Sequence, residues 1–176
     1  ITDACSVAGI PRAWAALKAQ PVKLITGSWF QLSDAPAGEA RPSFVLLART
    51  RKGYGQLCRL ITTGRRRADK GQYQLHGHDL DSHCLDDCLC LWQPPPLAGS
   101  DAQQALACGE WLQQRFHHRF WIAASRPLEA DEEQRLARIR WLADQLRCPI
   151  VATGEVHMHS RERQPLQDVL TALRHR

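Results

Sequence analysis

Short apolar runs alternate with longer amphipathic stretches along the whole chain. Continuous apolar runs are typical of strands buried on both faces, and apolar positions three and four residues apart are typical of helices. The pattern predicts strands at 22–32, 44–48, 89–92, 120–124 and 149–156, and helices at 8–19, 53–68, 101–116, 131–147 and 163–174. This alternation favours an α/β fold built from parallel βα units, although an open doubly wound sheet would fit as well.

Local signals place several helix ends. In the first helix Trp14 and Leu17 fall on the apolar side, and Pro21 stops it. Ser100 is a good N-cap for the helix at 101–116. The helix at 131–147 has acids in its first turn and Arg147 in its last, which suits the helix dipole.

Size and composition indicate one globular domain. The chain has 176 residues, of which 44% are hydrophobic, and no apolar run is long enough to span a membrane. The formal net charge is +5, with a basic cluster made of Arg65, Arg66, Arg67 and Lys70. Such a cluster fits a polyanion such as DNA, and it fits a solvated basic surface equally well.

Seven cysteines are present, and most lie inside apolar runs, where a free thiol packs as a small hydrophobe. This placement favours a reducing compartment, so we expect the protein in the cytoplasm. No glycine-rich dinucleotide or phosphate-loop motif follows any predicted strand, and nucleotide binding of those kinds is unsupported.

The strongest candidate chemistry follows the last predicted strand. Glu155 and His157 are two residues apart, so in an extended chain their side chains share one side. Barrel enzymes hold metal ions with such residues at the carboxyl ends of their strands.

A rival metal site lies in the middle of the chain, where potential ligands are densest: His76, His78, His83, Cys84, Cys88 and Cys90. The cysteine spacing differs from paired Cys-x2-Cys, and Cys88 and Cys90 would face one side of a strand, so a buried core pair is the competing interpretation. Cys5 could be proposed as a nucleophile, but nothing at recognisable spacing would orient a base for it.

Other motifs have plainer interpretations. His117 and His118 fall in a predicted solvated turn between a helix and a strand. The six tryptophans are expected mostly in the core, with Trp29 as the exception that we examine further.

Several short motifs recur in the order found in one known family. Residues 1–9, which begin Ile1-Thr2-Asp3-Ala4, together with 25–28, resemble the N-terminal PHP (polymerase and histidinol phosphatase) domain of C-family bacterial DNA polymerases. Residues 46–49, 53–62, 64–71, 156–159 and 166–172 resemble its error-prone, damage-inducible branch.

The resemblance implies that residues 1–176 are part of a distorted (βα)7-type PHP barrel whose first βα unit is missing. The palm, fingers and thumb of the polymerase, with the catalytic Mg²⁺, would lie outside this chain. The parent enzyme would copy damaged DNA in translesion synthesis. The implied partners are DNA, the thumb and palm, and further translesion proteins or the sliding clamp. A fragment without its first unit would expose a strand edge, so we expect marginal stability or self-association.

The resemblance also implies a degenerate metal site. Active PHP domains hold metal ions with histidine, aspartate and glutamate, but this chain has Ala4 where the family has a histidine and Trp29 where it has a glutamate. Glu155 replaces an aspartate, and only His157 matches. We therefore expect a catalytically silent scaffold that binds no metal. The alternatives are a metal-dependent PHP phosphoesterase or exonuclease, and a zinc-stabilised nucleic-acid-binding module.

Overall fold

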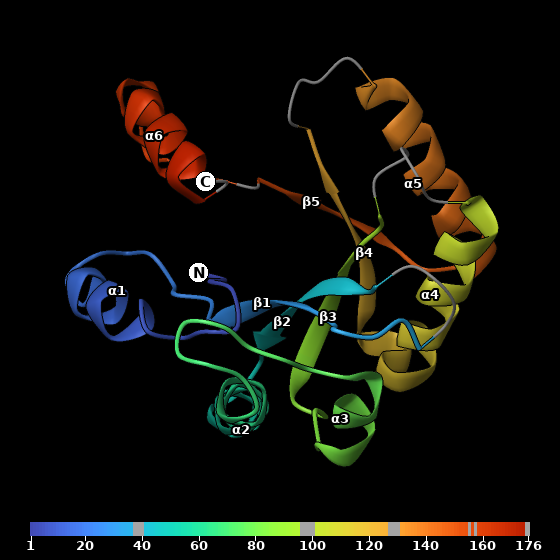
Figure 1. Cartoon of the computed structure of the whole chain (residues 1–176), viewed down its shortest axis with the longest axis horizontal. Coiled ribbons are helices and arrows are strands. Elements are labelled where there is room, and N and C mark those ends of the chain that lie inside the picture. Colours follow the sequence, from blue (N-terminus) through green and yellow to red (C-terminus); the bar gives the residue numbers. More distant parts are fainter. Residues whose placement is uncertain (37–40, 96–100, 127–130, 155, 157, 175–176) are drawn as a thin grey trace.

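The computed structural model describes residues 1–36, 41–95, 101–126, 131–154, 156 and 158–174. These residues form an α/β fold around one five-stranded mixed sheet of order β1-β2-β3-β4-β5 (Figure 1). The strands are β1 Gly27–Gln31, β2 Ser43–Ala48, β3 Cys88–Gln93, β4 Phe120–Ser125 and β5 Ile150–Thr153. The helices are α1 Ile10–Leu17, α2 Arg51–Arg66, α3 Gly77–Ser82, α4 Ala102–Phe116, α5 Glu132–Leu146 and α6 Gln164–Arg174.

The predicted α/β class is confirmed, whereas the expectation of parallel strands throughout is wrong for β2. That strand is antiparallel to both β1 and β3, while β3, β4 and β5 are mutually parallel. Four strands therefore share one direction and β2 alone is reversed. Because no helix lies between β1 and β2 in the residues described there, a short connection can return the chain antiparallel. In the described residues the sheet is open, and no barrel closes.

The core lies between one face of the sheet and the helices α2, α4 and α5. Along β3, Cys88, Cys90 and Trp92 are fully buried on this face, while Leu89 and Leu91 point to the other face and are only half-buried. The predicted core pair of Cys88 and Cys90 is thus confirmed. Gly109 on α4 lets the helix approach β3 closely, because a Cβ there would lie 2.7 Å from the Trp92 ring.

Several predicted bounds need correction. The strand expected at 22–32 begins only at Gly27, and the expected strand at 149–156 ends at Thr153. Asp101 caps α4, its carboxylate accepting from the amide of Gln103 at 3.1 Å, whereas Ser100 lies outside the described residues. Trp14 is 57% exposed, so it is not on a buried face.

The helix α3 was not predicted. It is short and polar, and tertiary hydrogen bonds hold it. The Asp34 carboxylate accepts from the amide of Gly77 at 3.0 Å, and the Asp79 carboxylate accepts from the amide of His76 at 2.8 Å. One of these hydrogen bonds joins residues far apart in the sequence, and the other is a polar contact at the start of the helix. The spacing of hydrophobic residues carries no information about either of them, so the helix could not be predicted from that spacing.

The last helix, α6, lies away from α4 and α5 (Figure 1). Its apolar residues recur at helical spacing and are all at least half exposed: Leu166, Val169, Leu170 and Leu173. The edge strand β5 is also poorly covered, and Ile150 is 42% exposed. None of the helices in the described part of the chain is long and apolar enough to cross a membrane.

Candidate functional site

The first five residues run alongside β1 as a parallel neighbour. The amide of Gly27 donates to the carbonyl of Ile1 at 3.0 Å, and the amide of Cys5 donates to the carbonyl of Trp29 at 2.8 Å. Ala4 and Trp29 form a parallel bridge, so they are direct neighbours in register. The structure therefore brings together the two positions that the family resemblance singled out.

Trp29 occupies this position with its ring half-buried against the sheet. Its indole Nε1 donates to Oε1 of Gln93 on β3 at 2.6 Å, reaching across β2. An indole N–H is a donor without a lone pair for a metal ion, and the Ala4 methyl offers no ligand at all. At this point the two side chains can pack and hydrogen-bond, but they cannot coordinate a metal.

Hydrogen bonds from Ser28 fix the N-terminal segment from one side. The buried Ser28 hydroxyl donates to the carbonyl of Asp3 at 2.8 Å and accepts from the amide of Ser6 at 2.9 Å. A buried hydroxyl that both donates and accepts is satisfied, so this contact orders the chain on each side of Ala4.

Arg65 on α2 holds the same segment from the other side. Its guanidinium donates to the carbonyls of Ala4 at 2.8 Å and Cys5 at 3.0 Å. It also donates to the carbonyls of Gly71 and Gln72, each at 3.1 Å. Arg65 thus ties two separate stretches of backbone, 4–5 and 71–72, to α2 beside the candidate site.

Cys5 follows Ala4, is fully buried and has a positive φ of 44°. Burial raises the pKa of its thiol to about 11, and the nearby Arg65 charge offsets only part of that effect. At neutral pH the group is therefore a protonated thiol, which is a poor nucleophile. This environment argues against the nucleophile interpretation of Cys5.

The two other predicted site positions, Glu155 and His157, lie outside the described residues. They follow Thr153, the last residue of β5, and β5 runs in the same direction as β1 and β3. Their metal-binding role stays a prediction.

The predicted basic cluster divides into two kinds of residue. Arg65 and Arg67 have protein partners: Arg67 forms a two-pronged ion pair with the carboxylate of Asp79 on α3, at 2.6 and 2.9 Å. Arg66, Arg67 and Lys70 are all exposed, and of these three only Arg67 forms such an ion pair within the described part of the chain. The proposed DNA contact remains a prediction for all four, and the structure leaves Arg66 and Lys70 the better placed to reach an external phosphate.

The histidines and cysteines of the possible zinc site have other contacts. His83 lies 3.0 Å from the Thr63 hydroxyl, and the Cys84 thiol lies 3.2 Å from Asp86. Burial raises the pKa of Cys88 to about 11 and that of Cys90 well above its usual range, which disfavours the thiolates that zinc requires. Across the described ranges, no three histidine, cysteine, aspartate or glutamate side chains gather to hold a metal ion.

Comparison with known proteins matches the sequence of almost the whole chain to one kind of enzyme. The chain is 44% identical over 174 residues to the error-prone DNA polymerase of Methylococcus capsulatus, and 46% identical over 174 residues to that of Pseudomonas aeruginosa. In both cases the match covers 99% of this chain. The chain is homologous to a segment of error-prone DNA polymerases. The error-prone DNA polymerase of Dechloromonas aromatica is 45% identical over 178 residues.

The chain spans only 16% of the length of these error-prone DNA polymerases. No family model matches the chain. The resemblance to the error-prone branch is therefore confirmed as homology, while the assignment of the segment to a PHP domain stays a prediction.

Proposed function

We propose that the chain is a PHP-type domain of an error-prone DNA polymerase and acts there as a catalytically silent scaffold. The homology over the whole chain supports the parent enzyme. In this proposal DNA synthesis, translesion copying and Mg²⁺ binding belong to the palm, fingers and thumb, which the matched segment does not include.

The pairing of Ala4 with Trp29 is the observation that carries the silent-scaffold proposal. These neighbours stand at positions where PHP enzymes use a histidine and a glutamate. Here they supply a methyl group and an indole that is already bonded to Gln93. A catalytic metal needs about three protein ligands, and two of the expected positions cannot contribute one.

The strand directions agree only in part with the proposed barrel, because β2 is antiparallel to both of its neighbours. Four of the five strands run the same way, and the N-terminal segment adds a further parallel pairing beside β1. The exposed apolar residues of α6 would pack against other parts of the polymerase, which is how a scaffold braces its neighbours.

Metal content and hydrolysis test this proposal directly. We expect the purified chain to hold almost no zinc or manganese by elemental analysis, and to leave a generic phosphoester uncleaved when Mn²⁺, Zn²⁺ or Mg²⁺ is added. The double variant A4H/W29E restores two ligand types at neighbouring positions, and its metal binding provides the comparison. Stoichiometric metal with turnover in the natural chain would overturn the proposal in favour of the phosphoesterase. Loss of stability in a chelator would favour the zinc module.

DNA binding provides a separate test of the basic cluster. Replacing both Arg66 and Lys70 with alanine should weaken binding of the chain to single-stranded DNA severalfold. The slope of the logarithm of affinity against the logarithm of salt concentration should also become shallower by about one to two, because fewer counterions are released on binding. The variant R12A/K23A removes the same charge from exposed positions elsewhere and serves as the control. Equal losses in the two double variants would show that net charge alone, and not this cluster, binds DNA.

A further inference from the structure

A cavity of about 470 Å³ opens where the end of α4 meets the turn between α5 and β5. Gln113, Gln114, His117 and His118 contribute from the α4 side, and Arg147 and Pro149 from the turn. It therefore lies at the starts of β4 and β5, whereas Glu155 and His157 follow the end of β5. Cavities of this size are large enough for a small-molecule ligand.

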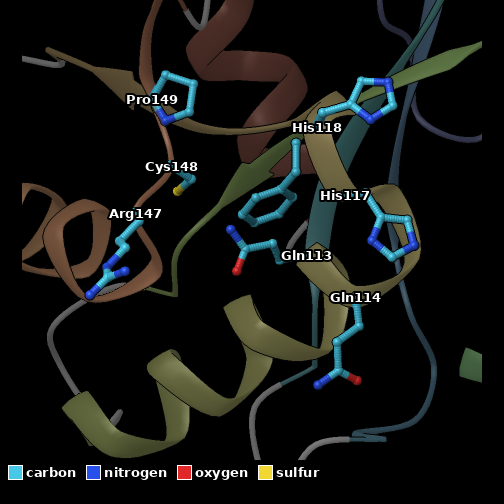
Figure 2. A pocket seen from close by; sticks show the side chains of 8 residues that line it. Gln113, Gln114, His117, His118, Arg147, Cys148 and Pro149 are labelled. Carbon is cyan, nitrogen blue, oxygen red and sulfur yellow. The ribbon is translucent and has the colours of Figure 1, made fainter.

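The two sides of the cavity carry different nitrogen-bearing side chains (Figure 2). Arg147 stands on one rim, and His117 and His118 stand on the other, with Gln113 between them. The Gln113 amide donates to the carbonyl of Leu146 at 2.8 Å, which ties the two rims together. No carboxylate lines this cavity among the described residues, so the positive charge of Arg147 is not neutralised by an acid in the lining.

The backbone of this cavity is strained at two of its lining residues. In the described part of the chain, only three residues other than glycine have a positive φ: Cys5, His117 and Arg147. His117 has φ 48° and ψ −123°, and Arg147 has φ 48° and ψ 44°. Residues held in such regions cluster at functional sites because the surrounding structure must compensate for the strain.

Arg147 is an unfavourable choice for its position in purely structural terms. It is the left-handed residue that ends α5, where its amide donates to the carbonyls of Ala143 and Asp144. Glycine adopts this conformation without the steric cost of a Cβ, and it is the usual residue at such helix ends. The positive charge of Arg147 suits the dipole at the end of α5, but glycine would avoid the steric cost of the left-handed conformation, and the exposed guanidinium is free to serve a further role.

We propose that this cavity binds the phosphate group of a nucleotide. A guanidinium presents paired donors that match phosphate oxygens, and the two histidines and the Gln114 amide can add further donors from the opposite rim. Phosphate is an anion that such a set of donors can bind with two or more hydrogen bonds, and a nucleotide fits the volume. The phosphate could belong to a free nucleotide or to the end of a DNA strand. This site does not depend on the proposed PHP assignment.

Binding of deoxyadenosine monophosphate to the full 176-residue chain tests the proposal by calorimetry, with unphosphorylated deoxyadenosine as the comparison. We expect deoxyadenosine monophosphate to bind at least tenfold more tightly. The variant R147G should lose this preference, and its melting temperature should rise because glycine relieves the strain. A gain in stability with a loss of binding cannot be explained by misfolding. The exposed control R12A, on α1, should bind as the natural chain does.

A short oligonucleotide with and without a 5′-phosphate distinguishes the two sources of phosphate. Tighter binding of the phosphorylated strand than of the mononucleotide identifies a strand end, and equal binding identifies a free nucleotide; both support the phosphate site. The variant H118A tests the opposite rim and should weaken deoxyadenosine monophosphate severalfold. The proposal is overturned by equal binding of nucleoside and nucleotide, or by R147G that binds the nucleotide unchanged.

Discussion

Replacing Arg65 with alanine should lower the free energy of unfolding by about 3 kcal/mol. The side chain donates to the carbonyls of Ala4, Cys5, Gly71 and Gln72, and hydrogen bonds to a charged group contribute about 1.5–3 kcal/mol each. Arg65 is only half-buried, so in the variant water can hydrogen-bond to some of these four carbonyls. The expected loss is therefore smaller than the summed contribution of the four hydrogen bonds. Urea unfolding followed by tryptophan fluorescence measures the change.

The neighbouring Arg66 is the matched control for this experiment. It has the same charge and lies on the same helix, but it is exposed. R66A should therefore change the free energy of unfolding by no more than about 0.5 kcal/mol. R65K keeps the charge but loses the planar fork, and it should fall between the two. Equal stability of R65A and R66A would show that Arg65 does not anchor the N-terminal segment.

Lowering the pH from about 4 to about 2 should decrease the free energy of unfolding, because the Asp79 carboxylate becomes protonated in this range. Burial of the Asp79 carboxyl alone would raise its pKa, but hydrogen bonds from Arg67 and from the amide of His76 outweigh burial and lower the pKa from 3.8 to about 2. A lowered pKa means that the folded state prefers the carboxylate. This preference contributes about 2 kcal/mol, present in full above pH 4 and lost as the pH falls through 2.

The variant D79N isolates this contribution. It should be about 2 kcal/mol less stable than the natural chain at pH 7, and the difference between the two should shrink toward zero as the pH approaches 2. Urea titrations at a series of pH values measure both curves. Asp69 is exposed, so D69N should follow the natural chain throughout. A constant difference between D79N and the natural chain would contradict the assignment to Asp79.

Sequence patterns located most of the helices because apolar residues recur along them at helical spacing, whether that stripe is buried, as in α2, α4 and α5, or exposed, as in α6. The helices α2, α4, α5 and α6 begin and end within two residues of their predicted bounds. The direction of β2 was missed, because a continuous apolar run reads the same in both directions. The absence of a helix between 22–32 and 44–48 was an available signal for an antiparallel return.

The candidate site was only partly accessible to sequence reasoning. The resemblance selected Ala4 and Trp29, and the structure places them side by side. The run of three arginines does not indicate which of them have protein partners. Arg65 and Arg67 do, whereas Arg66 points to solvent, because successive residues on a helix point in different directions. His117 and His118 are exposed as predicted, but only the fold brings Arg147 to the same cavity.

The hydrogen bond between Trp29 and Gln93 has a consequence for how this edge of the sheet is held together. A metal ion shared by several strands is a removable cross-link, and it is lost when the ion is scarce or a chelator is present. The indole and the amide connect β1 to β3 through atoms that belong to the chain itself. In the proposed scaffold, cohesion at this edge is therefore independent of the supply of divalent ions in the cell.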